Sequence, residues 1–352
     1  MENKRVAWVD YLKYFCIMMV IISHLESNTI ILKTIIDPVA LAGFFLASGY
    51  TYRHKEGFTK FFVKKLKGLF IPWLILSLFD IILAHIITFN IHKPLTEELK
   101  WNFLQIRERD DVLWFVAALF VIYIPFYFVI HFYEKHSLRE RSKWILMTIT
   151  FVGVLIAKLY IWCMPSKLFP WHTAALPWHI EYIPVGLFYM AMGYLFRTSF
   201  ETIFDENRKG RHLVIALLLY TVLIIVKLST FLPLALIITL NIVHSIIGLY
   251  ALIYLCKLFK ENKYMLYIGS NTLLVFAFHG KVYSVIQTLA KKLIGELYKS
   301  VISNVLTSSA FAIAIAIVVS IILIIPIWIV NRYAPFVAGK QYKKIEKQKK
   351  PN

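Results

Sequence analysis

Charged side chains are scarce in this chain of 352 residues. Only 17% of the residues are charged and 59% are hydrophobic, whereas a soluble domain carries about 25% charged residues. Apolar runs of about 20 residues, the length that crosses a bilayer core, recur from one end of the sequence to the other. The scarcity of charge therefore argues against a soluble globular protein and indicates a polytopic membrane protein.

Cysteine is rarer still, with three residues in the whole chain. Cys16, Cys163 and Cys256 each lie in or at the edge of an apolar run. They lack the spacing of metal ligands, so we interpret them as buried, small hydrophobic side chains. We therefore expect neither a metal site nor redox chemistry.

Acidic residues are outnumbered by basic ones, with 20 Asp and Glu against 39 Lys and Arg and a net charge of +19. On a soluble protein this excess would suggest nucleic-acid binding. Here the basic residues lie in short loops between apolar runs, where they set the orientation of membrane helices. If the N-terminus is cytoplasmic, the internal loops hold roughly twice as many basic residues as the external loops. We expect no nucleic-acid partner and a cytoplasmic N-terminus.

Ten apolar segments can be assigned as membrane spans. They are roughly 11–32, 37–53, 69–89, 112–132, 145–163, 182–198, 212–229, 233–256, 264–282 and 309–331. No internal repeat is evident, which weighs against transporters built from repeated halves. The prediction is an all-α integral membrane bundle of about ten transmembrane helices with both termini cytoplasmic. We expect one transmembrane domain over 1–335 and a basic cytoplasmic tail over 336–352.

The first span carries three ionisable residues, Asp10, Lys13 and His24. Lys13 and His24 differ by about 20° around an α-helix and lie roughly 16 Å apart along it, and Asp10 precedes Lys13 by one turn. Ionisable groups in hydrocarbon face a bundle interior or a wet cavity and mark function. The alternatives are a snorkelling Lys13 and an interhelical hydrogen bond from His24. Three such groups on one face favour a functional site.

The second span ends in "FFLASGYTYR", which contains Ser48, Gly49 and Tyr50. Gly49 permits close approach of a backbone or a break in the helix. Simple helix packing explains the same residues equally well. By itself this motif leaves both interpretations open.

Basic and apolar residues share helical spacing in the next stretch, "FTKFFVKKLKG", residues 58–68. We interpret this stretch as an amphipathic helix that lies on the inner membrane surface. Anionic lipids are its simplest partner. A docking surface for a polyanionic cytoplasmic ligand is the alternative.

Three more polar residues lie inside later spans, namely Asp80, His244 and His279. Asp80 is midway along the third span and can pair with Lys13 or His24. His279 lies near the outer end of the ninth span, at a depth similar to that of His24. Each of them alone is equally well explained as a hydrogen-bonded structural residue.

Five stretches occur in a fixed order along residues 9–279: "VDYLKYFCIMMVIISH", "GFFLASGY", "KKLKGLFIPW", "LWFVAALF" and "GSNTLLVFAFH". Together they resemble the membrane-bound acyltransferase 3 family, whose members are bacterial ten-span enzymes that O-acylate surface glycans. The resemblance implies a multi-pass enzyme of the bacterial plasma membrane. It also implies transfer of an acyl group, with acetyl the first expectation, from cytoplasmic acyl-CoA to a hydroxyl of a cell-surface or lipid-linked glycan.

The resemblance also implies roles for individual residues. His24 matches the family's key histidine and is expected to be the general base. The family usually has arginine eleven residues earlier; Lys13 stands there instead and keeps the charge without the planar, bidentate guanidinium. The other matched positions are Ser48, Gly49, Lys64, Lys67 and His279.

The expected catalytic residues are His24, Asp80 and His279. The expected substrate-binding residues are Asp10, Lys13, Ser48, Gly49, Tyr50, Arg53, Lys64, Lys67, Trp114 and Glu181. Asp80 or Glu181 is the candidate for orienting the ring of His24. His279 or Trp114 is the candidate for binding the acceptor or the oxyanion. Acyl-CoA is expected as a co-substrate, with no permanently bound cofactor and no metal.

Several alternatives stay open. Transfer can be direct, or it can pass through an acyl-His24 intermediate. A transporter or flippase for an anionic or lipid-linked substrate is the main rival function, and an inactive binding or sensor protein, suggested by Lys13, is the second. The acyl group can be acetyl or succinyl. The acceptor can be an exopolysaccharide, teichoic acid, peptidoglycan or a lipid-linked sugar. The expected partners are acyl-CoA, this acceptor and membrane lipids, with the oligomeric state open.

Overall fold

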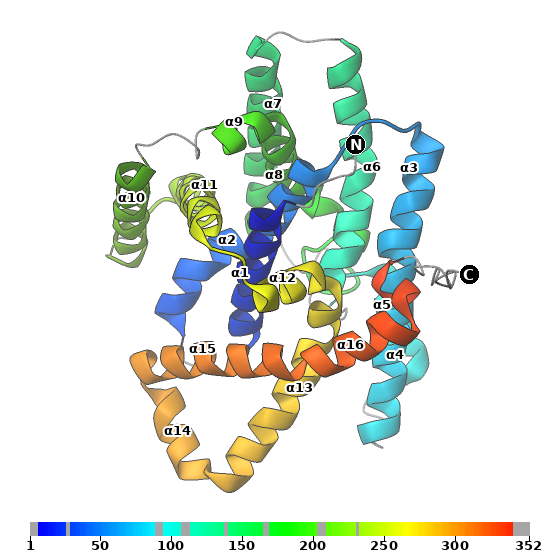
Figure 1. Ribbon diagram of the computed structural model, residues 1–352, viewed down its shortest axis with the longest axis vertical. Helices are drawn as coiled ribbons and strands as arrows, with labels where there is room; N and C mark the ends of the chain where they lie inside the picture. Colours follow the sequence, from blue (N-terminus) through cyan, green and yellow to red (C-terminus); the bar gives the residue numbers. More distant parts are fainter. Residues whose placement is uncertain are drawn as a thin grey trace, which may run out of the picture.

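The structure is a computed structural model that describes residues 6–25, 29–88, 94–106, 113–136, 140–164, 169–202, 209–229 and 232–340. In these residues every regular element is a helix, as Figure 1 shows. The elements are α1 (Ala7–His24), α2 (Ile30–Thr51), α3 (Phe58–Lys65), η1 (Leu66–Phe70), α4 (Ile71–Thr88), α5 (Leu95–Leu104), α6 (Trp114–Lys135), α7 (Glu140–Cys163), η3 (Pro177–Tyr182), α8 (Ile183–Leu195), α9 (Arg197–Thr202), α10 (Lys209–Ser229), α11 (Leu234–Leu258), α12 (Lys263–Ser270), α13 (Thr272–Leu293), α14 (Gly295–Ser303), α15 (Val305–Ile322), α16 (Ile324–Tyr333) and η4 (Pro335–Ala338). The predicted all-α class is confirmed.

Nine helices in the described part of the chain are long and apolar enough to cross a membrane. Helices suit this role because all their backbone hydrogen bonds are made within the segment. The remaining expected span, 182–198, contains α8, which has only 13 residues. This short helix lies inside the bundle, packed against α2, α6 and α7. The predicted bundle of about ten helices is therefore confirmed, with one of the ten shorter than a full span.

The basic segment before the third span is continuous with that span. α3 passes through the π-helical turn η1 into α4, and the two helices follow one another down the same side of the molecule (Figure 1). The N–H of Ile71 donates to the carbonyl of Leu66, five residues earlier. Pro72 accounts for this wider turn, because its nitrogen cannot donate to the carbonyl of Gly68. The helix expected over 58–68 is therefore present over Phe58–Lys65, but it runs on into the third span.

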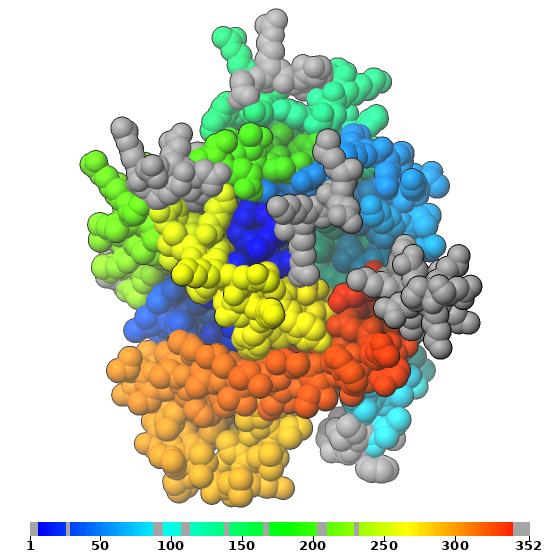
Figure 2. All heavy atoms as spheres, in the orientation of Figure 1, coloured from blue at the N-terminus to red at the C-terminus, as the bar shows by residue number. Residues whose placement is uncertain are grey.

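Helices α1 and α2 form the centre of the bundle. Only a small blue patch of α1 is visible between its neighbours in Figure 2, and α1 packs against α2, α11, α12 and α13. α2 and α8 meet backbone to backbone: a Cβ on Gly49 would overlap the carbonyl oxygen of Met190, and one on Gly193 would overlap that of Leu46. Small residues allow this close approach. Gly49 thus serves helix packing, and its position does not support the expected role in substrate binding.

The end of the described chain returns to the bundle. Gly339 has φ +67, and its Cα packs against the carbonyl oxygen of Gly68, where a Cβ would clash. The Nζ atom of Lys340 lies 2.5 Å from Oδ1 of Asn271. These contacts hold the first residues of the expected basic tail against η1 and the junction between α12 and α13. The remainder of that tail, 341–352, lies outside the described residues.

Candidate active site

Two histidines from distant parts of the chain meet at one end of the bundle. His24 is the last residue of α1, and His279 lies in α13. Their ring centroids are 5.2 Å apart, and the rings are inclined at 68°. His24 is exposed, whereas only 1% of the surface of His279 is accessible. The sequence placed both at a similar depth, and the structure brings them together.

Backbone carbonyls orient both histidine rings. Nδ1 of His24 lies 2.8 Å from the carbonyl oxygen of Val20, and Nδ1 of His279 lies 2.9 Å from that of Phe276. A carbonyl oxygen can only accept, so Nδ1 carries the hydrogen in each neutral ring. The lone pair is then on Nε2. His24 thus presents an exposed basic nitrogen at the end of α1.

The two carboxylates expected to orient His24 lie elsewhere. Asp80 Oδ1 pairs with Lys281 Nζ at 3.0 Å, which joins α4 to α13. Glu181 is buried, and its Oε2 accepts a hydrogen bond from the backbone N–H of Leu176 at 3.0 Å. The expected pairing of Asp80 with Lys13 or His24 is therefore wrong. A helical histidine finds a carbonyl four residues earlier within reach, so no carboxylate is needed to fix the ring.

Asp10 and Lys13 form an ion pair in the N-terminal part of α1. Oδ1 of Asp10 lies 2.7 Å from Nζ of Lys13. Asp10 is buried, with 4% of its surface accessible, and a buried carboxylate needs such a partner. The ammonium of Lys13 stays partly accessible and faces a cavity. The predicted clustering of these two residues on one face is confirmed.

That cavity has a volume of about 220 Å³ and lies between α1, α2, α6 and α13; it is called the channel below. Most of its lining is apolar, with Lys13, Ser48 and Thr272 among the polar exceptions. Phe276 lines the channel, and its ring centroid lies 5.9 Å from that of His279. The channel therefore ends one aromatic side chain away from the histidine pair.

A second, basic cavity of about 270 Å³ adjoins the channel, because Thr51 lines both. Its positively charged lining residues are Arg53, Lys55, Lys64 and Lys65. Glu56 is the one acidic lining residue, and its Oε1 lies 3.8 Å from Nζ of Lys64. Lys67 is exposed and does not line this cavity. Of the basic residues expected to bind substrate here, Arg53 and Lys64 are on its wall and Lys67 is not.

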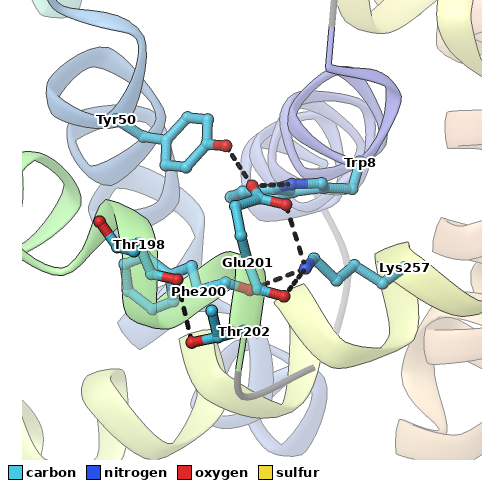
Figure 3. Close-up of polar contacts among 7 residues, drawn as sticks. All are labelled: Trp8, Tyr50, Thr198, Phe200, Glu201, Thr202 and Lys257. Atoms are coloured by element: carbon cyan, nitrogen blue, oxygen red, sulfur yellow. Dashed lines mark hydrogen bonds and ion pairs between the residues drawn. The ribbon is translucent and has the colours of Figure 1, made fainter. Parts of the chain in front are cut away.

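Tyr50 belongs to a polar cluster that joins four helices, shown in Figure 3. Its hydroxyl donates to Oε1 of Glu201 in α9, and Nε1 of Trp8 donates to the same oxygen at 3.0 Å. Nζ of Lys257 lies 3.4 Å from Oε2. Burial raises the pKa of Glu201, but these hydrogen bonds and the lysine charge outweigh it and hold that pKa below its usual range. Tyr50 is therefore part of a structural hydrogen-bond cluster, and its expected contact with substrate stays a prediction.

Arg197, which was not among the residues predicted from the sequence, fixes the end of α2. Its Nε donates to the carbonyl of Tyr50 at 2.8 Å and one terminal nitrogen to that of Tyr52 at 2.5 Å. A cation near a helix C-terminus satisfies carbonyls that have no helical partner. Arg197 thereby positions the loop that carries Arg53. A basic residue directly after a short, glycine-containing span was the available signal.

A third and larger cavity, of about 780 Å³, lies at the histidine end of the bundle. It is enclosed by α2, α7, α8, α10 and α11, and Thr29 lies at its edge. Ser23, which precedes His24, donates through Oγ to Oδ1 of Asp37 on the cavity wall at 2.6 Å. The last turn of α1 therefore adjoins this cavity, which is called the outer cavity below because the predicted orientation places the histidine end of the bundle outside.

Trp114 lies beside the outer cavity. Its ring centroid is 5.0 Å from that of His179 and 5.3 Å from that of Tyr182, and Tyr182 lines the cavity wall. This aromatic cluster could not be predicted from the sequence, because Trp114 is distant along the chain from His179 and Tyr182. Trp114 is therefore one ring removed from the cavity.

No group of three His, Cys, Asp or Glu side chains within the described ranges is arranged to hold a metal ion.

Comparison with curated proteins and with solved structures gave no significant match. A family model described as an acyltransferase domain matches residues 6–328, nearly the whole chain. The channel, the histidine pair and this match agree: the chain belongs to the acyltransferase 3 family and is a multi-pass membrane acyltransferase.

Proposed function

We propose that this protein is an O-acyltransferase that moves an acyl group, acetyl in the simplest case, from cytoplasmic acyl-CoA to a glycan hydroxyl. The acceptor reaches the protein from the outer face of the bacterial plasma membrane. The observation that carries the proposal is the order of three cavities around the histidine pair. The basic cavity adjoins the apolar channel at Thr51, Phe276 of the channel lies beside His279, and the last turn of α1 adjoins the larger cavity.

The basic cavity suits the nucleotide part of acyl-CoA. Its four basic side chains and single carboxylate attract a ligand with several phosphate charges. The apolar channel suits the thin pantetheine arm, with Lys13 and Ser48 as its polar contacts. The thioester carbonyl is then presented toward the histidine pair. The small volume of the channel favours a short acyl group such as acetyl.

His24 is the general base of the proposed reaction. Its Nε2 lone pair takes the proton of the acceptor hydroxyl as the hydroxyl oxygen attacks the thioester carbonyl. The new C–O bond replaces the C–S bond, and CoA leaves as a thiolate on the cytoplasmic side. The proton on His24 returns to that thiolate or to water. His279, buried and neutral, stabilises the transient imidazolium of His24 with its own Nε2 lone pair.

The test is acetyl-CoA turnover by the purified protein in detergent. We expect slow hydrolysis by the wild type and at least 100-fold slower hydrolysis by His24→Ala, with acetyl-CoA binding retained. His136→Ala is the matched control, because Nδ1 of His136 also lies 2.8 Å from a carbonyl four residues earlier, on an exposed helix end far along α6. A wild type that neither binds nor turns over any acyl-CoA would overturn the proposal and favour a transporter.

The same purified protein distinguishes a covalent acyl-histidine route from direct transfer. Radiolabelled acetyl-CoA should leave label on the wild type, and no label on His24→Ala, if an acyl-histidine forms. Direct transfer predicts no protein-bound label in either case while turnover continues. We favour direct transfer, because it needs only the proton acceptor that the geometry provides.

A further inference from the structure

Two parts of the channel wall come from segments that lie far apart in the chain. Leu69 belongs to η1, directly before the third span, whereas Thr272 and Leu273 begin α13. A channel that binds a flexible arm needs such segments at a fixed separation, because a loose wall has to be ordered at the moment of binding. The residues that precede these segments, Gly68 and Asn271, both contact the end of the described chain.

Gly339 makes the first of these contacts, with the backbone of η1. Its φ is +67, a left-handed conformation that glycine adopts without strain. Its N–H donates to the carbonyl of Phe336 at 3.0 Å, at the end of η4. A Cβ at Gly339 would lie 2.6 Å from the carbonyl oxygen of Gly68. This position therefore needs glycine both for its conformation and for the close approach to η1.

Lys340, the next residue, makes the second contact. Its Nζ donates to Oδ1 of Asn271 at 2.5 Å and to Oδ1 of Asn331 at 2.8 Å. Nδ2 of Asn331 donates to the same oxygen of Asn271 at 2.8 Å, and Nδ2 of Asn271 donates to the carbonyl of Tyr267 at 2.7 Å. Asn271 is buried, with 5% of its surface accessible. These hydrogen bonds therefore replace those that its amide would make to water.

Asn271 is also the corner at which α12 ends and α13 begins. Its N–H donates to the carbonyl of Ile268 in α12 at 3.0 Å. Its carbonyl accepts from the N–H groups of Leu274 and Val275 in α13, at 3.0 and 3.1 Å. The bonds to its side chain therefore hold the direction in which α13 leaves this corner. Because Thr272 follows directly, the same bonds hold the α13 part of the channel wall.

We propose that Gly339 and Lys340 form a C-terminal clamp that positions the walls of the donor channel. Gly339 holds η1 and Lys340 holds the start of α13, so both act through Leu69 and Thr272 and are positioning residues. This inference rests on the proposed function, because the ligand of the channel is the pantetheine arm of acyl-CoA. Neither clamp residue is among the described residues that line the basic cavity. Loss of the clamp should therefore weaken the hold on the arm and leave the nucleotide site intact.

The test compares two ligands by isothermal titration of the purified full-length protein in detergent. Acetyl-CoA would occupy the basic cavity and the channel, whereas adenosine 3′,5′-bisphosphate lacks the arm and would occupy the basic cavity alone. We expect Gly339→Ala to raise the Kd for acetyl-CoA about ten-fold and Lys340→Met to raise it about five-fold, since the channel loses its preorganised shape. The Kd for the bisphosphate should stay within about two-fold of the wild type in both variants.

Matched variants accompany each change. Gly68→Ala is the control for Gly339→Ala, because a Cβ at Gly68 meets open space on the other side of the same contact. Lys340→Arg keeps the charge and the donors of the clamp and should restore tight binding of acetyl-CoA. Lys263→Met, at an exposed position on α12, controls for the loss of one positive charge. All three should bind both ligands as the wild type does.

The outcomes separate the clamp from the proposed function. Equal weakening of both ligands in the clamp variants would overturn the inference, because it would indicate general loss of the fold or a direct contact of Lys340 with the nucleotide. An unchanged Kd for acetyl-CoA in Gly339→Ala and Lys340→Met would also overturn it. In both cases a wild type that binds acetyl-CoA leaves the proposed function standing. A wild type that binds neither ligand would contradict the proposed function and the clamp with it.

Discussion

Lys13 stands in the first span where the family that the chain resembles usually has arginine. Its ammonium lies 2.7 Å from the buried carboxylate of Asp10 and also faces the channel. One charge therefore stabilises Asp10 and remains available to a ligand. A lysine can do both, because its three donors are not committed to one plane.

We expect Lys13→Gln to raise the Kd for acetyl-CoA about ten-fold, since a charge-assisted contact is lost. Lys13→Arg should keep the Kd within about three-fold of the wild type, because the charge remains. Isothermal titration of the purified variants measures both values. Ser303→Ala, an exposed change on α14, is the control. An unchanged Kd in Lys13→Gln would show that the channel does not hold the donor.

Some contacts between individual residues could be predicted from the sequence, and others could not. The meeting of His24 and His279 was predictable, because depth along a helix follows from residue count. The position of Asp80 against Lys281 was not, because it depends on which faces of α4 and α13 meet. The role of Tyr50 was hidden for the same reason, since Glu201 lies about 150 residues later in the chain.

At the scale of elements, the C-terminus of α2 is the junction between the bundle and the basic cavity. Arg197 binds two carbonyls there, and Arg53 donates to the carbonyl of Tyr50 at 2.9 Å. The loop over 52–57 depends on both guanidinium groups. The conformation of this loop therefore depends on Arg197 of α9, which comes far later in the sequence.

Arg197→Ala should loosen that loop and raise the Kd for acetyl-CoA roughly five-fold, although Arg197 lines no part of the basic cavity. Proteolysis of the loop should become faster in parallel. Arg332→Ala, on α16, is the matched arginine control. If proteolysis and Kd are both unchanged, Arg197 does not hold the loop.

The α2–α8 crossing gives a prediction about packing. Gly193→Ala places a methyl group against the backbone of Leu46 and should destabilise the protein by about 1–3 kcal/mol. Gly280→Ala, in open space within α13, should stabilise it by up to about 1 kcal/mol through helix propensity. Thermal unfolding in detergent measures both changes. Equal effects of the two substitutions would contradict the close crossing.

For the whole molecule, Glu201 links stability to pH. Its pKa is held below the usual range, so its contribution to stability is fully present above the ordinary glutamate pKa of about 4.3. That contribution is lost as pH falls through the lowered value. We expect Glu201→Gln to lower Tm by about 2–5 °C at pH 7. The difference from wild type should shrink on acidification below pH 4, and a constant difference would show that the cluster is not charged.

The helices of this protein could be predicted from the sequence more completely than the contacts between them. Apolar run length fixed the helices, because a bilayer imposes one length on every full span. It placed the start of the third span at residue 69, whereas α3 continues through the wider turn before Pro72 into α4. The outer cavity could not be predicted, since its five helices are brought together only by packing.

The aromatic end of the channel has a consequence for the membrane potential of the cell. Phe115 and Phe276, with ring centroids 6.0 Å apart, line the channel where it approaches the histidines. A path closed by aromatic rings resists the leak of ions and protons, so the membrane potential is preserved while a small acyl group passes. In the proposed reaction, a thioester made in the cytoplasm supplies the free energy for acyl transfer outside the cell, where no nucleotides are supplied. The rate of acylation at the cell surface then follows the cytoplasmic ratio of acyl-CoA to free CoA. The degree of acylation of the envelope therefore reflects the metabolic state of the cell.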